Sequence, residues 1–126
     1  MINFWSKVIR CDENWMDADL DDVVDNIEHV KNLIGIDHIG IGADYDGLSY
    51  NDLPIGLEDV SRYPNLFARL LQRPGWTIED VKKVTAHQHT KKIIFLLVEP
   101  CDFHVGKRGI HATLARFARD VHFILA

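Results

Sequence analysis

The sequence has few of the features that define disulfide scaffolds, membrane spans or nucleic-acid binders. Its 126 residues include two cysteines, Cys11 and Cys101, which are too few for a disulfide framework. They could pair with each other, pair with segments outside this sequence, or stay reduced. The longest apolar run, residues 93–98, is far shorter than the roughly 20 residues that cross a bilayer, and no apolar signal segment follows Met1. Lys and Arg number 14 against 19 Asp and Glu, and this net charge of −5 argues against nucleic acid as the main partner.

The composition that remains is typical of one soluble globular domain. Apolar residues make up 47% of the chain and charged residues 26%. The charge is uneven, because residues 1–66 contain 4 Lys and Arg against 14 Asp and Glu. Either the two parts of the chain are differently solvated, or the acidic part faces a cation or a basic partner.

The first half of the chain predicts a strand, a helix and a second strand. Residues 1–5 are apolar enough for a short strand, and the polar residues 6–18 read as a loop. A helix is expected from Asp19, which can cap it, to Ile34, with Gly35 as its stop. Residues 36–42 are short, β-branched and bounded by glycine, which indicates a buried strand.

The second half predicts helices. One helical turn is expected over residues 57–61, and a helix over residues 64–72 with Pro64 in its first turn. Thr77 and Asp80 resemble a capping box for a further helix, which ends at about His89 or continues through Val98. A last amphipathic helix fits residues 110–125.

This order of elements is that of a parallel α/β protein, but two strands close neither a sheet nor a barrel. We therefore expect the chain to begin within a domain whose other strands come from elsewhere.

The strongest chemical signal follows the second predicted strand. Asp44 is the first acidic residue past the carboxyl end of that strand, where parallel α/β enzymes place catalytic groups. It could act as a general base or hydrogen-bond a metal-bound water. Alternatively, Asp44 and Asp46 are turn formers beside Gly47.

Two linked motifs resemble the membrane dipeptidase (renal dipeptidase) family of the metal-dependent amidohydrolase superfamily. Residues 38–47 resemble the family's strand-eight signature GxDFDG, with Tyr45 in place of Phe. Residues 56–66 resemble its downstream signature GLEDVSKYPxL, with Arg62 in place of Lys. The resemblance covers roughly residues 1–98 and leaves residues 99–126 as a divergent tail, in which the helix over 110–125 is expected.

The resemblance implies the last two strands and helices of a (β/α)8 TIM-type barrel that hydrolyses dipeptides at a two-zinc centre. Asp44 matches the aspartate that contacts the bridging hydroxide and handles its proton. Tyr45, Asp46 and Gly47 are weaker candidates for substrate binding. The resemblance further implies homodimers and, in animal members, glycolipid anchoring outside the cell.

The zinc ligands of such a family lie upstream of Met1 in the matched register, so none can be assigned to this chain. Among local residues, His87 and His89 would face apart on a helix, and Cys101 with His104 lacks a second cluster. His38 is expected in the strand core, and His29 on the surface.

These observations leave three hypotheses. The chain is the C-terminal piece of a zinc metallodipeptidase, inactive alone. Alternatively, it is a non-catalytic interaction module or regulatory truncated form that pairs with a full-length subunit. In the third, it forms no stable fold, because a partial barrel exposes strand edges and core surface.

Overall fold

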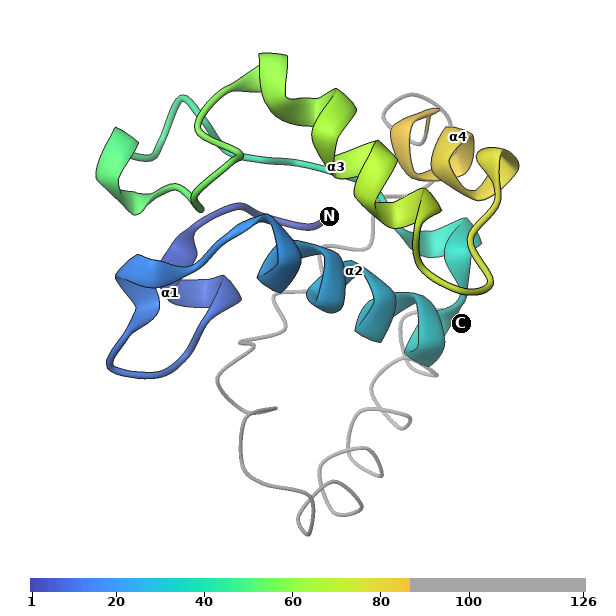
Figure 1. Ribbon diagram of the computed structural model, residues 1–126, viewed down its shortest axis with the longest axis horizontal. Coiled ribbons are helices and arrows are strands. Elements are labelled where there is room, and N and C mark those ends of the chain that lie inside the picture. Colours follow the sequence, from blue (N-terminus) through green and yellow to red (C-terminus); the bar gives the residue numbers. More distant parts are fainter. Residues whose placement is uncertain (87–126) are drawn as a thin grey trace, which may run out of the picture.

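The computed structural model describes residues 1–86, which fold into helices around a short pair of extended segments (Figure 1). The α-helices are α1 (Ser6–Ile9), α2 (Leu20–Ile34), α3 (Tyr63–Leu71) and α4 (Ile78–Ala86). Four 3-10 turns connect them: η1 (Trp15–Asp17), η2 (Ile36–His38), η3 (Tyr50–Asp52) and η4 (Val60–Arg62). The predictions for residues 87–126, including the helix over 110–125 and the tail at 99–126, lie outside the described residues.

The two predicted strands are reduced to one parallel bridge, which joins Ile2 to Ile41. The backbone N–H of Ile2 donates to the carbonyl of Gly40 at 2.7 Å, and that of Gly42 donates to the carbonyl of Ile2 at 2.9 Å. The parallel pairing is therefore present, but the part of the chain that the structure describes is mostly helical and holds little strand.

The start of the second predicted strand is a correction. Residues Ile36–His38 form the turn η2, and the extended backbone begins at Ile39. Gly35 ends α2 with a φ of 82°, a conformation that favours glycine. The chain therefore turns sharply before it can extend.

Helix α2 confirms its prediction from both ends. Asp19 accepts hydrogen bonds from the backbone N–H groups of Asp21 and Asp22, and the Asp22 side chain accepts in return from the Asp19 N–H. This reciprocal capping satisfies donors that a helix start otherwise leaves unpaired. On the inner face, Val23, Val24 and Ile27 are fully buried.

Helices α3 and α4 also form where the pattern predicts them. Pro64 lies in the first turn of α3, and Leu66 and Leu70 are buried beneath it. Before α4, the Thr77 hydroxyl accepts from the Asp80 N–H at 3.2 Å, and the Asp80 carboxylate accepts from the Thr77 N–H at 3.0 Å. Aspartate therefore serves in the capping box where glutamate is more common.

The predicted loop at 6–18 contains more structure than expected. The Trp5 carbonyl accepts hydrogen bonds from Val8 at 2.8 Å and Ile9 at 3.0 Å, which closes α1. A second parallel bridge, between Asp19 and Ile55, joins the start of α2 to residues 48–60, which we name the later loop. The later loop is therefore held against the N-terminal end of α2.

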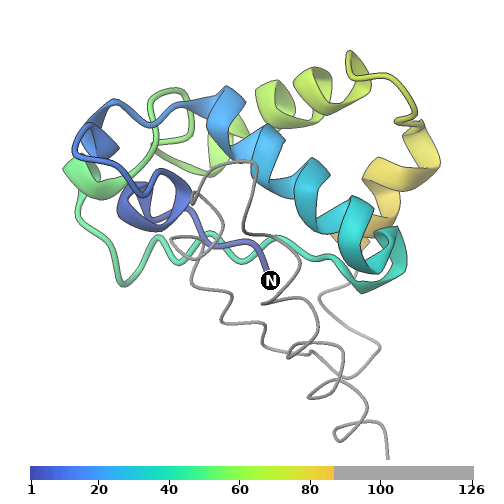
Figure 2. The same ribbon diagram turned by 90° about the horizontal axis from the view of Figure 1, so that it is seen from below.

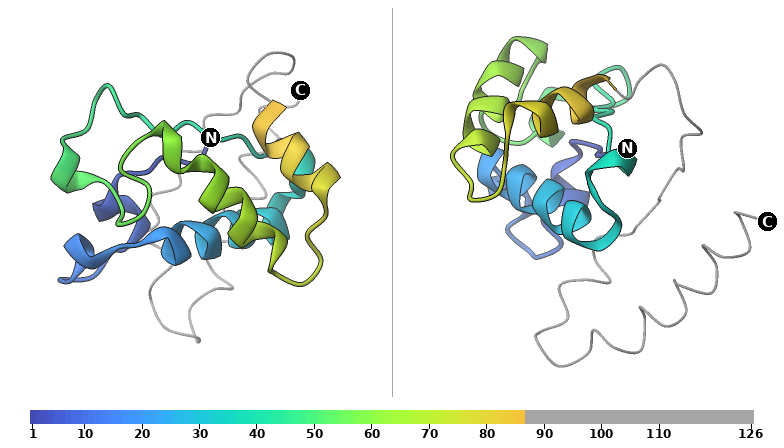
Figure 3. Two further views of the ribbon diagram at one scale, coloured as in Figure 1. Left: turned by 45° about the horizontal axis from the view of Figure 1, so that its top comes forward. Right: turned by 90° about the vertical axis from the view of Figure 1, so that its right-hand side faces the viewer.

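The helices cover one face of the extended pair (Figure 2). Helices α2 and α3 contact each other, and α4 contacts α3 and η2 (Figure 3). Phe4 is fully buried between these layers, with its ring edge-on to Tyr45 and Tyr63 at 6.0 Å from each. The core therefore joins the extended pair to the helical layer and fixes where the pair ends.

Candidate active site

Asp44 lies where the sequence predicts it, directly after the carboxyl end of the extended segment 39–43. Ala43 before it is 5% exposed, whereas Asp44 itself is exposed. Its φ of 63° is the one positive value among the non-glycine residues that the structure describes. Aspartate tolerates this left-handed conformation better than most residues, so the backbone can turn outward here. The carboxylate is therefore available to solvent at the edge of the extended pair.

Two neighbours determine how the Asp44 carboxylate is held. The side-chain amide of Asn3, which belongs to the first extended segment, donates to Oδ2 of Asp44 at 3.2 Å. Gly47 closes the following turn, with its N–H donating to the Asp44 carbonyl at 3.0 Å. A Cβ at Gly47 would lie 3.0 Å from Oδ1 of Asp44. A side chain at residue 47 would therefore crowd the carboxylate in this position.

Tyr45 points into the molecule. Its hydroxyl donates to the carbonyl of Leu57 at 3.0 Å, and its ring packs 6.2 Å from that of Tyr63. Burial, reinforced by Tyr63, raises the pKa of Tyr45 well above its usual value. The hydroxyl is engaged in tying the site turn to the segment at 57, and the substrate-binding role of Tyr45 stays a prediction.

Asp46 and Gly47 are exposed in the same turn as Asp44. An open hollow of about 310 Å³ lies next to this turn, over the later loop. It is lined by Tyr45, Leu48, Tyr50, Leu53, Glu58, Asp59 and Val60. The site turn thus borders a recess, and the substrate-binding roles of Asp46 and Gly47 also stay predictions.

A hydrogen bond anchors the wall of the hollow. Oε1 of Glu58 accepts from the Gly56 N–H at 2.8 Å, which holds the pKa of Glu58 below its usual value. Gly56 has a φ of 89°, so it meets the Glu58 side chain in a conformation that favours glycine. The motif around residue 56 therefore builds the loop that faces the site turn.

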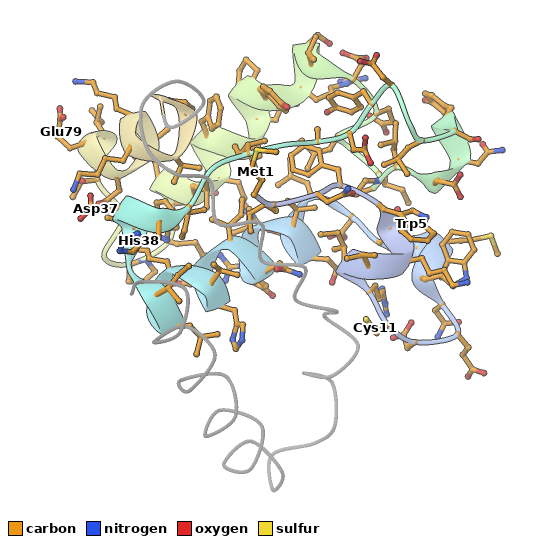
Figure 4. All side chains as sticks on the ribbon, turned by 180° about the vertical axis from the view of Figure 1, so that it is seen from behind. Met1, Trp5, Cys11, Asp37, His38 and Glu79 are labelled. Carbon is orange, nitrogen blue, oxygen red and sulfur yellow. The ribbon has the colours of Figure 1, made fainter. Side chains whose placement is uncertain are left out.

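Residues 1–86 contain no group of three or more His, Cys, Asp or Glu side chains that could hold a metal ion. His38 is exposed in η2, which corrects its expected place in the strand core, and His29 is exposed on α2 as predicted. Asp37 and His38 lie toward the opposite end of the molecule from Trp5 (Figure 4). His87, His89, Cys101 and His104 lie outside the described residues. Zinc needs three or four protein ligands, so the described residues do not fit a zinc centre by themselves.

One of the two cysteines, Cys11, lies among the described residues. None of the described residues is a free cysteine, and Cys11 follows α1 at the far side of the molecule from Asp37 (Figure 4). Cys101 lies beyond the described part of the chain.

A second cluster of charges lies on the outer side of α2 and α3, away from the extended pair. Arg69 donates to both carboxylate oxygens of Asp21, at 2.5 and 2.7 Å, and Arg73 pairs with Asp25. The Arg69 guanidinium holds the pKa of Asp21 below its usual value. These pairs join the two helices, and we name this cluster the α2–α3 seam.

The sequence pointed to Asp44 but missed Asn3. The two residues are 41 positions apart, and the parallel pairing of residues 2 and 41 brings their segments side by side. In that register Asn3 lies two positions before the residue opposite Asp44, so a prediction of the register alone would not have found it.

Comparison with known proteins identifies the class. The family model for membrane dipeptidase (peptidase family M19) matches residues 1–91, and the chain belongs to this family. It is a family of metallopeptidases that are generally zinc-dependent.

Particular relatives are dipeptidases of fungi. Dipeptidase aclJ of Aspergillus oryzae is 46% identical over 88 residues, which are 68% of this chain and 19% of the relative. Dipeptidase tcpJ of Claviceps purpurea is 41% identical over 93 residues, 74% of this chain and 20% of the relative. The chain thus spans about a fifth of the length of the curated relatives that it matches.

Among residues 1–86, none of the helices is both long and apolar enough to cross a bilayer.

Proposed function

We propose that this chain supplies one wall of the active site of a zinc-dependent dipeptidase, with the Asp44 carboxylate as the group that carries a proton. One observation supports this most directly. The carboxylate is exposed at the carboxyl end of a parallel pair, while the residues before it are buried. That end of parallel strands is where α/β enzymes gather catalytic groups from several segments. The family and the names of the fungal relatives support dipeptides as the substrate.

In the complete enzyme we expect the extended pair to be two strands of a (β/α)8 barrel. Asp44 would accept a proton from the water that attacks the peptide carbonyl. It would return that proton to the amine that leaves when the C–N bond breaks. Oδ2 is held by Asn3, which leaves Oδ1 for this exchange.

We expect the chain alone to be inactive, because residues 1–86 provide one wall and no set of metal ligands. We further propose that the whole protein supplies the remaining metal ligands, forms homodimers and is anchored to the membrane outside the cell.

A second candidate is a non-catalytic role, in which the chain pairs with a full-length subunit. Large apolar side chains of the later loop favour this candidate: Tyr50, Ile55 and Val60 are 58–70% exposed. Exposed apolar side chains grouped in one loop are a common feature of interaction surfaces.

The test exchanges a segment between relatives. Residues 1–91 replace the matching segment of the Aspergillus oryzae protein, and dipeptide hydrolysis is measured with added zinc. We expect activity from the exchanged protein, loss of at least about 100-fold on Asp44→Asn, and little change on Asp21→Asn in the α2–α3 seam.

If the 126-residue chain alone hydrolysed dipeptides and Asp44→Asn abolished this activity, the chain would not need metal ligands from elsewhere. That result would overturn the expectation that the chain alone is inactive. Full activity of the exchanged protein carrying Asp44→Asn would remove Asp44 from the chemistry.

A further inference from the structure

We infer that Asn3 is a positioning residue for the Asp44 carboxylate, and this inference rests on the proposed function. The two side chains meet between segments that are far apart in the chain. The amide of Asn3 donates to Oδ2 of Asp44 at 3.2 Å, in an exposed position at the end of the extended pair. Asn3 lies 41 residues before Asp44 in the chain, and the two meet because their segments pair in parallel.

Asn3 is itself held in place by a second hydrogen bond. Its Oδ1 accepts from the backbone N–H of Trp5 at 2.7 Å. This bond uses the oxygen of the amide and turns the nitrogen toward Asp44, which fixes the orientation of the amide group. The residues on both sides of Asn3, Ile2 and Phe4, are 7% and 0% exposed, so the backbone beneath it is anchored in the core.

The other oxygen of the carboxylate lies beside Gly47, where an added Cβ would come to 3.0 Å from Oδ1. Because residue 47 is glycine, no side chain from it crowds this oxygen. Asp44 therefore has a donor on one oxygen and no side chain of residue 47 against the other. A carboxylate held by one oxygen keeps its orientation for proton exchange, and small misplacements of catalytic groups lower rates strongly.

The two hydrogen bonds of Asn3 can be separated by substitution. Asn3→Asp has nearly the same shape and keeps an oxygen for the Trp5 N–H, but the ionised side chain cannot donate to Asp44 and repels it. Asn3→Ala removes both bonds. If Asn3 matters only for the start of α1, the Asp variant behaves like the wild type. If it positions Asp44, the Asp variant is at least as impaired as the Ala variant.

The first measurement is kinetic, in the exchanged dipeptidase described above. We expect Asn3→Ala and Asn3→Asp each to lower kcat by about tenfold or more, with KM within about twofold, because a hydrogen bond to a charged group is lost where the rate depends on it. Asn65→Ala, at an exposed position on α3, is the matched control and should leave both constants unchanged.

The second measurement needs no activity. In the 126-residue chain, NMR should show a shift of one Asn3 side-chain amide proton on Asp44→Asn and none on Asp21→Asn. Wild-type kcat in Asn3→Asp, or an Asn3 amide that ignores Asp44→Asn, would overturn the inference. An inactive exchanged protein would count against the proposed function alone, since the amide shift then decides the role of Asn3 by itself.

Discussion

Asp44 and Asp21 are both accessible carboxylates, yet they differ in how much of their hydrogen-bonding capacity the fold uses. Asp21 faces Arg69 across two helices and accepts from it on both oxygens. Asp44 receives one side-chain hydrogen bond, from a neutral amide, and its backbone takes a left-handed conformation. The α2–α3 seam therefore neutralises its acids, whereas the end of the extended pair keeps one carboxylate with an oxygen to spare.

This contrast shows how acidic residues can be sorted in a chain with excess negative charge. Most of the acids of α2 cap the helix or pair with arginine, so the fold itself gives these residues partners. An acid that the fold leaves accessible, in a constrained backbone conformation and beside a buried core, is the better candidate for chemistry. Four sets of substitutions test this contrast between the two carboxylates.

The first prediction concerns the apolar packing of α3 beneath the α2–α3 seam. Leu70→Ala should lower the free energy of unfolding by about 2–5 kcal/mol, because Leu70 is fully buried and its loss leaves a cavity. The adjacent Leu71 is 42% exposed, so Leu71→Ala should cost less than about 1 kcal/mol. Denaturant unfolding of the chain measures both. Equal losses would mean that α3 is not packed as described.

The second prediction concerns the end of the extended pair. Gly47→Ala places a methyl group against Oδ1 of Asp44, so we expect about a tenfold loss of kcat in the exchanged dipeptidase. Asn65→Ala, at an exposed position on α3, is the control and should keep the wild-type kcat. If both variants kept wild-type kcat, the placement of the Asp44 carboxylate would have no role in the rate.

The third prediction separates the packing of Tyr45 from the chemistry of its neighbour. Tyr45→Phe removes the donor to the Leu57 carbonyl and should lower the free energy of unfolding by about 1 kcal/mol. The raised pKa of Tyr45 also predicts a pH effect. The folded chain holds this proton more tightly than the unfolded chain, so stability is complete below about pH 10 and falls as the pH rises above it.

Unfolding measured from about pH 9 to 11 should therefore show a shallower decline in Tyr45→Phe than in the wild type. A decline of the same slope in both proteins would place the alkaline titration elsewhere.

The smallest effect is expected from the seam's own ion pair. Arg69→Ala should lower stability only slightly at low salt and still less in high salt, because the pair is exposed and screened. The lowered pKa of Asp21 means that its contribution is present above about pH 3.9 and is lost as the pH falls below that value.

Thermal unfolding in 0.05 and 1 M salt checks the screening, with Lys82→Ala, whose partner Glu79 is on the same helix, as control. A salt-independent loss in Arg69→Ala would indicate that packing of its side chain, not its charge, is what α3 requires.

The sequence by itself determined the helices, because their signals are local. The caps at Asp19 and Thr77, the stop at Gly35 and the apolar periodicity all act within a few residues, and α2, α3 and α4 form where they predict. It also determined that Asp44 follows a buried extended segment, and two linked motifs were enough to indicate the family.

How the acid is held, and how much strand exists, depend on contacts between segments that are distant in the chain. The parallel pairing of Ile2 with Ile41 is such a contact, and it brings the segments of Asn3 and Asp44 side by side. The expected strands are reduced to this one bridge, and a strand requires a paired neighbour as well as suitable residues of its own. The inward direction of Tyr45 likewise depends on the ring of Phe4 and the Leu57 carbonyl, which reach it from opposite directions along the chain. Local signals fix elements, whereas contacts between distant segments fix the orientation of the groups that do chemistry.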